Sequence, residues 1–317
     1  MIIVTGGAGF IGSNIVRHLN EAGVTDILVV DDLADGHKAM NLAGARIADY
    51  LDHEEFLAHL AARRDFGGRV SGVLHQGACT VTTEWDGRLM MQRNHAFSRE
   101  LLHWCLEKGV ALVYASSASV YGAGRESRVA PECERPVNVY AWSKLVFDQH
   151  VRRLVASAQS PVVGLRYFNV YGPGEAHKGA MASVVWHFHN QLGHGEELRL
   201  FEGSHGHGPG EQRRDFIHVD DVARANLWFL AHGGSRGIFN LGTGRARSFN
   251  DVARAVIAWH GRGRIRYVPF PPGLLAGYQS FTEADLATLR LAGYPHDFIG
   301  LEEGVRAYLD WLKASAA

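Results

Sequence analysis

Apolar and polar positions follow two different periods along the first half of the chain. Short apolar runs with the length of buried strands occupy residues 2–4, 27–30, 70–74, 111–114 and 162–165. Stretches with helical spacing lie between them, at 11–21, 94–108 and 140–155. Strands that alternate with helices are typical of a parallel sheet covered on both faces. The pattern therefore predicts a doubly wound α/β fold.

After about residue 170 the pattern loosens, because glycines and Pro173 divide the chain into short pieces. Residues 216–219 and 238–241 still have the composition of strands from the larger sheet. We therefore expect a nucleotide-binding domain at 1–169 with returning segments at about 215–241. Residues 170–214 and 242–317 would form a smaller mixed α/β domain that binds substrate.

Composition narrows the class of protein. The 317 residues are 46% hydrophobic and 21% charged, which is typical of a globular chain and excludes disorder. The net charge of −1 gives no bulk attraction to nucleic acid or membrane surfaces. Three cysteines without a CxxC pair, Cys79, Cys105 and Cys133, favour a reducing compartment. With no leader pattern and no apolar run of about 18 residues, we expect a cytoplasmic protein without membrane contact.

A glycine-rich loop lies between the first strand and the first helix. Gly6 permits the turn, Gly9 allows a pyrophosphate to approach the backbone, and Gly12 allows close packing of helix on strand. Asp31 follows Gly12 by 19 residues, a distance suited to an acid that binds adenosine ribose hydroxyls. In this context the loop favours a Rossmann-type dinucleotide site over a purely structural turn.

The choice of nicotinamide cofactor stays open on charge alone. Lys38 is placed to meet a 2′-phosphate, which favours NADP, although a solvated loop lysine is equally compatible with the pattern. Asp31 and Asp32 would repel that phosphate, which favours NAD.

A second motif places Tyr140 and Lys144 four residues apart on one helix face. An ammonium group one turn away favours phenolate and is expected to lower the tyrosine pKa, which makes Tyr140 a usable base. The upstream strand ends in a serine-rich segment, 114–122, that can supply a hydroxyl to the reacting oxygen.

These motifs resemble the extended short-chain dehydrogenase/reductases that modify nucleotide sugars. The resemblance rests on TGGAGFIG, HQGAC, YASSASVYG, YAWSK, RYFNVYGP and RRDFIHVDDVA, which span most of the chain in the expected order. Dehydratases of that family carry an acid pair directly after the strand-end serine. Here Ser117 is followed by Ala118 and Ser119, so reversible hydride transfer with inversion is the expected reaction.

The chain is more closely similar to the ADP-L-glycero-D-manno-heptose 6-epimerases, on TTEWDG, HKGAMASV, LFEGS, NLWFL and GIFNLGTG. That resemblance implies inversion at carbon 6 of ADP-D-glycero-D-manno-heptose, through a transient 6-keto sugar with bound NADP, for lipopolysaccharide heptose supply. It also implies a homo-oligomer, with a homopentamer as the expected form.

The resemblance assigns the two acid/base positions to Tyr140 and Lys178, the oxygen-steadying hydroxyl to Ser117 and the cofactor-ribose contact to Lys144. By local pattern alone Lys178 is a solvated loop lysine. A lysine base at this position requires a pKa lowered by burial or by a neighbouring cation.

The resemblance also carries over two sets of binding positions. Those for the cofactor are Gly6, Gly9, Phe10, Ile11, Gly12, Asp31, Asp32, Lys38, His53, Gln76, Gly77, Ala78, Cys79, Thr80, Arg93, Asn94, Lys144, Val170 and Lys178. Those for the substrate are Asn169, Ala180, His187, Phe201, Glu202, Gly203, Ser204, Arg214 and Tyr278.

Of the substrate positions, Arg214 suits a diphosphate clamp, with a surface ion pair to Asp215 as the alternative. His187 has the pattern of a core or surface histidine and is chosen on the resemblance alone.

Several positions depart from the family. Ala180 stands in place of serine, which removes one substrate hydrogen bond. Asp32 replaces asparagine and His53 replaces lysine, and both changes weaken a pocket for a 2′-phosphate. Arg93 occupies a family asparagine position, which leaves open whether Arg93 or Asn94 meets the cofactor.

The segment 204–212 is longer than in relatives, and its two histidines and glutamate raise the question of a metal. Consecutive turns without a regular scaffold favour a flexible surface loop, so no metal is expected.

Two other functions compete with the leading one. A UDP-hexose 4-epimerase would keep the fold and Tyr140 but would not need Lys178. A non-catalytic cofactor-binding protein on the same fold is disfavoured, because both Tyr140 and Lys144 are present.

Overall fold

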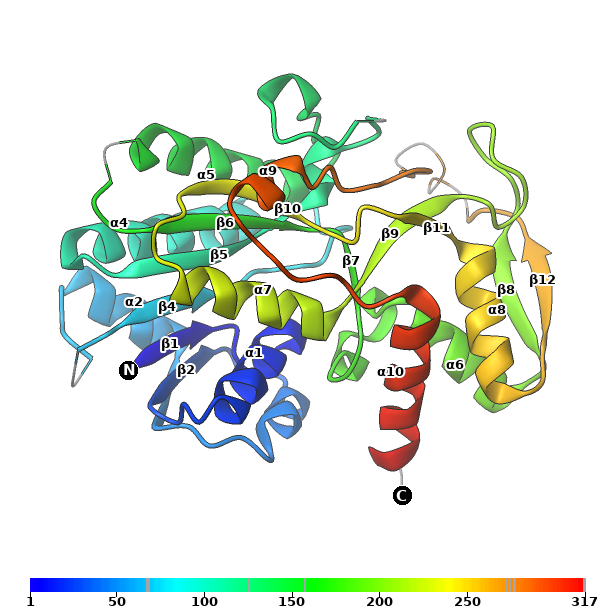
Figure 1. The fold of residues 1–317 in the computed structure, drawn as a ribbon, viewed down its shortest axis with the longest axis horizontal. Helices are drawn as coiled ribbons and strands as arrows, with labels where there is room; N and C mark the ends of the chain where they lie inside the picture. Colours follow the sequence, from blue (N-terminus) through cyan, green and yellow to red (C-terminus); the bar gives the residue numbers. More distant parts are fainter. Residues whose placement is uncertain are drawn as a thin grey trace.

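The computed structural model describes residues 1–66, 69–124, 126–156, 158–271, 273, 275 and 278–315. Its main element is a seven-stranded parallel sheet with the strand order β10-β6-β5-β4-β1-β2-β3 (Figure 1). In chain order these strands are β1 (Ile2–Thr5), β2 (Ile27–Asp31), β3 (Asp49–Asp52), β4 (Gly72–His75), β5 (Ala111–Ser117), β6 (Val162–Tyr167) and β10 (Gly237–Leu241). The predicted doubly wound α/β fold is confirmed, and the expected strand at 70–74 begins two residues later.

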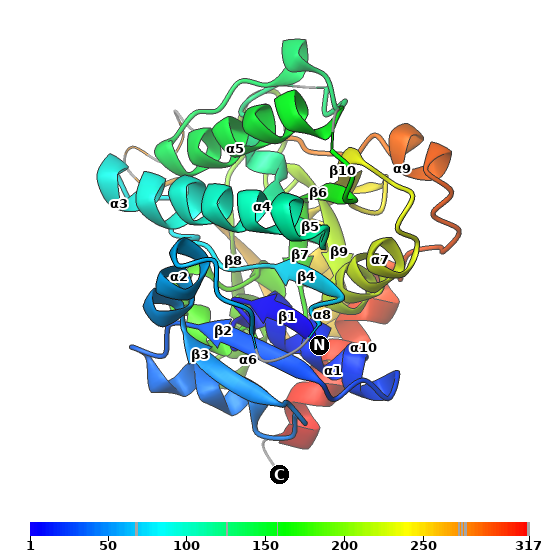
Figure 2. The ribbon, with the colours of Figure 1, turned by 90° about the vertical axis from the view of Figure 1, so that its left-hand side faces the viewer.

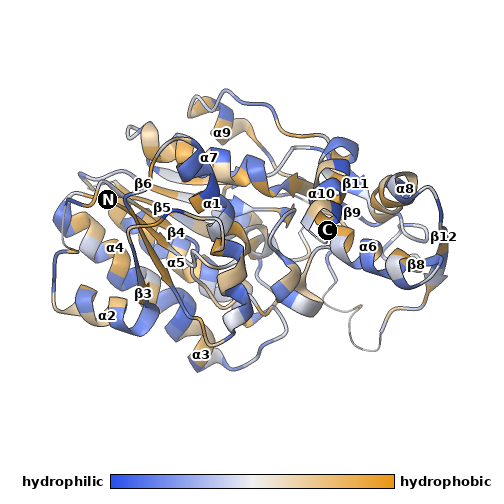
Figure 3. Ribbon diagram, turned by 90° about the horizontal axis from the view of Figure 1, so that it is seen from below, coloured by the Kyte–Doolittle hydropathy of each residue, from blue (hydrophilic) through white to orange (hydrophobic). Residues whose placement is uncertain are grey.

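Helices cover both faces of this sheet (Figure 2). Alternate residues of each strand point to opposite faces, so Val4 and Val29 pack with α1 (Phe10–Glu21) and α7 (Val219–Ala231). Ile3 and Val30 pack on the other face, under α2 (His53–Ala61), α4 (Phe97–Lys108) and α5 (Val139–Val155). Figure 3 shows the hydrophobic positions concentrated on the strands between the two helical layers.

The helix expected at 94–108 is interrupted. A short helix, α3 (Gly87–Met91), leads into a π-helical turn at Gln92–Ala96, and α4 follows directly. The turn brings the side chain of Asn94 inward, where it is fully buried. Helix α4 ends at Gly109 in the left-handed conformation.

The C-terminal half forms a second layer of structure beside the sheet. It contains η5 (Ala176–Met181), α6 (Val184–His194), β8 (Glu197–Phe201), α8 (Phe249–His260), β12 (Arg264–Val268) and α10 (Leu301–Ser315), whereas α9 (Ala287–Leu291) packs against β10 of the main sheet. Helices α6, α8 and α10 share one core with β8. Strands β12 and β8 pair in parallel.

The two segments expected to extend the larger sheet have different positions. Residues 238–241 belong to β10, which pairs with β6 at the edge of the main sheet. Residues 216–218 belong to β9 (Arg213–His218), in a separate three-stranded sheet with β7 (Asn169–Tyr171) and β11 (Ala246–Ser248). Val219 already begins α7.

The glycine loop is possible only without side chains at two positions. Gly6 has φ of +63°, and a Cβ there would lie 2.6 Å from the amide nitrogen of Gly77, beyond the end of β4. A Cβ on Gly12 would overlap the carbonyl oxygen of Gly6. The loop therefore brings β1, α1 and the segment after β4 into backbone contact.

In the described part of the chain, no helix is long and apolar enough to cross a membrane.

Replacing Gly12 with alanine is expected to lower the free energy of unfolding by about 2 kcal/mol or more, because the loop backbone must shift to admit a methyl group. The matched control is Gly193→Ala in α6, where an added Cβ meets nothing within 4 Å. That variant should be neutral or gain up to about 1 kcal/mol. Urea unfolding of both variants measures the difference, and equal stabilities would contradict this account of Gly12.

Candidate active site

The candidate site lies where the carboxyl ends of β1, β2, β4 and β5 meet. The chain runs from β1 toward β2 on one side and, after β3, from β4 toward β5 on the other, so the strand order reverses between β1 and β4. Ligands of open α/β sheets bind in the crevice at such a switch point. The glycine loop, Asp31, the segment after His75 and Ser117 all follow strands that end at this edge.

Asp31 holds the glycine loop in place. One carboxylate oxygen accepts hydrogen bonds from the amides of Ala8 at 2.8 Å and Gly9 at 3.2 Å. The other accepts from the amine of Lys38 at 2.7 Å. Asp31 and Lys38 are therefore paired with each other at the predicted ribose position.

A second cluster of polar side chains, formed by Asp32, Arg93 and His53, lies beside this pair. The Arg93 guanidinium donates to Asp32 at 3.2 Å and lies 2.7 Å from the His53 imidazole. A hydrogen bond from the Ala34 amide is the main cause that lowers the pKa of Asp32, with Arg93 adding to it. Each acid at this edge thus has its own cation, which offsets the repulsion expected between the two acids and a 2′-phosphate.

The structure separates the roles of Arg93 and Asn94. Arg93 is partly exposed beside Asp32, whereas Asn94 is fully buried. The Asn94 amide accepts from the amide of Cys79 at 2.8 Å and donates to the hydroxyl of Ser143 at 3.0 Å. Asn94 therefore ties the segment after β4 to α5, and Arg93 is the residue of the two that lies beside Asp32.

Hydrogen bonds to β1, β6 and α7 hold the segment that follows β4, which includes Gln76 to Thr80. The Gly77 amide donates to Thr5, and the Gln76 side chain accepts from Tyr167 at 2.9 Å and donates to Asn226 at 3.1 Å. The backbone of Gln76 and Gly77 also lies directly against Gly6 of the glycine loop.

Tyr140, Ser117 and Lys144 come together at the end of β5. Ser117 hydrogen-bonds to the Tyr140 hydroxyl, which lowers the Tyr140 pKa, but burial is the larger effect and the pKa is raised overall. The Lys144 amine donates to the carbonyl of Ala115 at 2.9 Å, and burial lowers its pKa to about 8.

The expected direction of the Tyr140 pKa is wrong for this structure. Helical spacing correctly predicts that Tyr140 and Lys144 lie on one helix, α5. It does not include the loss of water around the phenol, which disfavours the charged form.

Lys178 lies over the first helix. Its ammonium nitrogen is 5.0 Å from the centre of the Phe10 ring, and burial lowers its pKa. Two contacts connect the segment around it to the N-terminal part of the chain: Asn14 of α1 donates to the Pro173 carbonyl at 2.8 Å, and Asn41 of η1 (Gly36–Leu42) lies 3.2 Å from His177. The solvated loop lysine expected from local pattern is therefore wrong, since the Lys178 side chain is partly buried against Phe10.

A cavity of about 310 Å³ opens between α6, β8 and α8. Three of the predicted substrate residues line it, His187, Phe201 and Tyr278, and the aromatic ring of Phe249 forms another wall. Asn169 and Ala180 do not line this cavity, although the Ala180 carbonyl lies 3.3 Å from the His187 ring.

Arg214 is buried against two walls of this cavity. Its guanidinium carbon lies 5.0 Å from the Tyr278 ring centre and 5.8 Å from that of Phe249. Asp215 points elsewhere, accepting hydrogen bonds from Thr243, Gly244 and Ala284. The alternative of an ion pair with Asp215 is wrong, and among the described residues no carboxylate pairs with Arg214.

The long segment 204–212 begins with a tight hairpin at 204–207 and continues as turns. Ser204 and His207 exchange backbone hydrogen bonds, and the Gln212 amide donates to the carbonyl of Glu202 at 2.7 Å and to the Ser204 hydroxyl at 3.1 Å. A Cβ on Gly203 would lie 2.5 Å from the His207 carbonyl oxygen. Across the described ranges, no group of three or more potential metal ligands is present.

Sequence reasoning missed a buried polar network under the serine-rich segment. Asp148 of α5 accepts from Tyr114, Ser116 and Arg166, and Arg166 also pairs with Glu134. A detectable signal was present, because an arginine inside a fully buried strand requires a buried anionic partner.

Glu175, buried beneath the Lys178 turn, was also missed. It accepts from the amide of Gly172 at 3.3 Å and from the hydroxyl of Ser183 at 2.7 Å.

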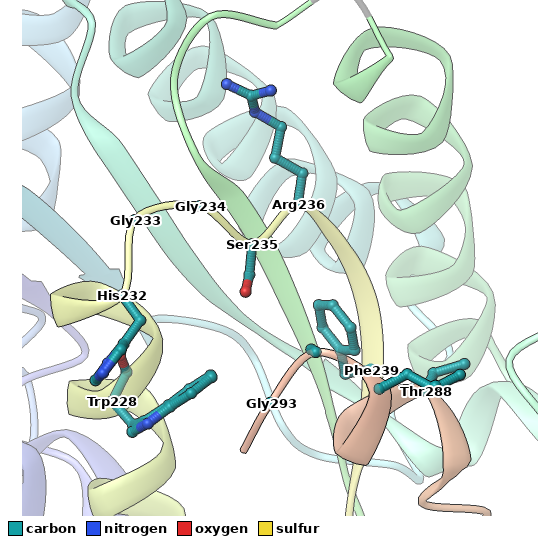
Figure 4. A pocket seen from close by; sticks show the side chains of 11 residues that line it. Trp228, His232, Gly233, Gly234, Ser235, Arg236, Phe239, Thr288 and Gly293 are labelled. Carbon is teal, nitrogen blue, oxygen red and sulfur yellow. The ribbon is translucent and has the colours of Figure 1, made fainter. Parts of the chain in front are cut away.

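A second concavity lies elsewhere. A shallow depression of about 990 Å³ is bordered by Trp228 and His232 of the α7 end, by residues 233–236, and by Phe239 and Thr288 (Figure 4). It adjoins the amino end of β10, on the edge of the sheet opposite the glycine loop. It is therefore separate from the candidate active site.

Comparison with known proteins identifies the class. Residues 2–242 match the NAD dependent epimerase/dehydratase family, and the chain belongs to that family. Its structure is similar to the ADP-L-glycero-D-manno-heptose-6-epimerase of Helicobacter pylori, with 31% identity, 99% of this chain and 96% of that chain covered, and a TM-score of 0.86.

Enzymes that act on other nucleotide sugars are similar as well. The UDP-N-acetylglucosamine 4-epimerase of Methanobrevibacter ruminantium has 25% identity, coverage of 99% and 98%, and a TM-score of 0.84. The UDP-glucose 4-epimerase of Thermus thermophilus, solved with NAD, has 31% identity, 99% coverage of both chains and a TM-score of 0.80. The chain is thus an enzyme of the nucleotide-sugar epimerase/dehydratase class.

Acid should destabilise the fold through His75, which lies buried between Thr5 and Ser98. Burial lowers its pKa from 6.5 to about 3, so the unfolded chain takes up the proton first as pH falls. The stability due to the neutral imidazole is complete above pH 6.5 and is lost toward pH 3, with about 2 kcal/mol lost by pH 5.

Unfolding by urea between pH 5 and 7 measures this loss. His75→Gln should flatten the pH dependence, whereas the control His37→Gln, at an exposed side chain, should leave it unchanged. A slope that persists in His75→Gln would exclude His75 as its source.

Proposed function

We propose that the protein is an ADP-heptose 6-epimerase, which interconverts ADP-D-glycero-D-manno-heptose and ADP-L-glycero-D-manno-heptose with NADP and supplies heptose for lipopolysaccharide. The observation that carries the proposal is Lys178, which lies partly buried over Phe10 at the start of α1 and has a pKa that burial lowers. A 6-epimerase of this kind uses a second acid/base group at that position, in addition to Tyr140.

The residues present fit a dinucleotide. Helix α1 begins at Gly9 without a side-chain cap, so its first amides remain available to a pyrophosphate. Gly6 and Gly12 leave no room for side chains beneath this site. A nicotinamide cofactor bound there supplies the hydride acceptor and donor.

The chain's own residues supply the proton transfers. Tyr140, hydrogen-bonded to Ser117, accepts the hydroxyl proton of carbon 6, and Ser117 steadies the oxygen. After the keto sugar rotates in the site, Lys178 acts on its opposite face and returns a proton to the oxygen of carbon 6. The lowered pKa of Lys178 increases its capacity to act as a base near neutral pH.

Two features support NADP, with NAD as the alternative. Lys38 and Arg93 place two cations at the adenosine edge, and His53 lies beside them. Asp31 and Asp32 already pair with those cations, so a 2′-phosphate would compete with the acids for them. The pairing keeps both cofactors compatible with the site, and the cofactor that copurifies with the protein decides between them.

The nucleotide part of the substrate is assigned to the aromatic cavity near α6. His187, Phe201 and Tyr278 line it, and the guanidinium of Arg214, which has no carboxylate partner among the described residues, lies against the Tyr278 ring and suits a diphosphate. We assign residues 1–169 and about 215–241 to cofactor binding and residues 170–214 and 242–317 to substrate binding. The proposal includes a cytoplasmic homo-oligomer, with the homopentamer as its expected form.

A UDP-hexose 4-epimerase is the second candidate, because the similar structures include two UDP-sugar 4-epimerases. The two functions differ in the substrate converted and in the need for Lys178.

The deciding experiment incubates the purified protein with ADP-D-glycero-D-manno-heptose, without added cofactor, and follows carbon 6 by NMR. A mixture of both epimers supports the proposal and shows that the cofactor is retained and recycled. No conversion, even after NADP or NAD is added, refutes it, and conversion of UDP-glucose instead favours the second candidate.

Lys178→Met should reduce epimerisation at carbon 6 by about 10²-fold or more, because one of two acid/base groups is lost. Tyr140→Phe should cost at least as much while the cofactor stays bound. Lys108→Met, at a lysine on the far end of α4, is the control and should leave turnover unchanged. Full activity of Lys178→Met would rule out its role and favour the 4-epimerase.

Arg214→Met should weaken the binding of ADP by about 10-fold to 100-fold, because a charge-assisted phosphate contact is removed. Arg213→Met, at the exposed neighbouring position, is the matched control and should bind ADP nearly as the unmodified protein does. Isothermal titration calorimetry measures both affinities, and equal losses in the two variants would refute a specific clamp.

A further inference from the structure

The helix that carries Tyr140 and Lys144 carries a third polar residue on the same face. Tyr140, Lys144 and Asp148 are spaced by four residues along α5, so their side chains lie on one line toward β5. Asp148 is fully buried, as is Arg166 of β6 beside it. A buried carboxylate is costly unless several donors satisfy it, and here the donors come from two strands.

Asp148 connects α5 to the end of β5 at two side chains. Tyr114 and Ser116 both donate to its carboxylate at 2.9 Å, one to each oxygen. Between them in sequence, the Ala115 carbonyl accepts from Lys144 at 2.9 Å. These three contacts fix the position of residues 114–116 against the helix, and Ser117 follows directly and reaches Tyr140.

Asp148 is held in turn from the opposite side. The Arg166 guanidinium donates to it at 2.9 Å through Nε, and Arg166 also donates to the Tyr121 hydroxyl at 3.0 Å and pairs with Glu134. Glu134 is further bound by Arg152 at 2.8 Å. The carboxylate therefore has a defined place and a defined charge.

We propose that Asp148 is a positioning residue for the candidate reaction, which aligns Ser117 with Tyr140 and holds a fixed negative charge one helical turn from the Lys144 ammonium. This inference rests on the proposed function for the consequences in turnover. The charge and the contacts of Asp148 can be tested without any substrate.

The groups around Lys144 come from three elements. Asp148 lies on its own helix, His75 lies on β4, and Tyr114 of β5 binds Asp148. His75 is neutral at working pH, because burial lowers its pKa to about 3. In the described part of the chain, Asp148 is the carboxylate that favours the charged form of Lys144, against burial, which lowers its pKa to about 8.

The test is a pH titration of Lys144 by NMR in protein labelled with ¹³C at the lysine ε-carbon. The chain contains five lysines, at positions 38, 108, 144, 178 and 313, so each resonance can be assigned from single Lys→Arg variants. In Asp148→Asn, loss of the negative charge should lower the Lys144 pKa by about one pH unit. Asp148→Glu keeps the charge and should restore most of the difference.

Glu134→Gln is the matched control. It makes the same change from carboxylate to amide in the same network, but next to Arg152 and Arg166 rather than Lys144. It should leave the Lys144 titration unmoved. An unchanged titration in Asp148→Asn, or an equal shift in Glu134→Gln, would overturn the proposal.

If Asp148→Asn does not fold, the double variant Asp148→Asn with Arg166→Met removes the unpaired guanidinium as well and is titrated in its place. The lower Lys144 pKa is expected there too, and an unchanged value overturns the proposal.

Turnover gives a second readout. With a Lys144 pKa one unit lower, Asp148→Asn should lose about fivefold more activity at pH 8 than at pH 6, relative to the unmodified protein. A purely structural defect would reduce activity by the same factor at both pH values. If the unmodified protein converts no ADP-heptose, the proposed function fails, and the Lys144 titration still decides the role of Asp148.

Discussion

The parallel arrangement of the main sheet is the constraint on which the candidate site depends. All seven strands point the same way, so the residues that follow them meet along one edge. Gly6, Asp31, Gly77 and Ser117 lie far apart in the chain and are brought to this edge by strand register alone. Backbone contact between the glycine loop and the loop after β4 needs glycine at position 6, because a side chain there would occupy the space of Gly77.

At this edge of the sheet, each acidic side chain is paired with a basic side chain of the protein. Asp31 pairs with Lys38, and Asp32 with Arg93. Farther inside, Asp148 and Glu134 both pair with the buried Arg166. Burial of this charged side chain without such partners would be costly. The partners surround the end of β5 from α5 and β6, so the polar groups that maintain the fold also determine where Ser117, Tyr140 and Lys144 lie.

Burial determines the protonation of the residues assigned to chemistry. Lys144 and Lys178 both have lowered pKa values because water is excluded around them, and for the same reason the Tyr140 pKa is raised. The phenolate form of Tyr140 is therefore less favoured in this structure than its spacing from Lys144 predicts. Groups that stabilise a charge on Tyr140 or Lys144, such as Ser117 and Asp148, have a larger effect on the pKa where water is excluded.

The sequence by itself determined the sheet, because strand and helix periods, the glycine loop and the Tyr140–Lys144 spacing are local patterns. It also supplied most of the candidate residues, through motifs that keep their order along the chain. Three features were decided only by tertiary structure: the desolvation of Lys178, the absence of an Arg214–Asp215 pair in the described part of the chain and the Asp148–Arg166 network. Each depends on which side chains from distant segments exclude water or supply a partner, and no local pattern carries that information.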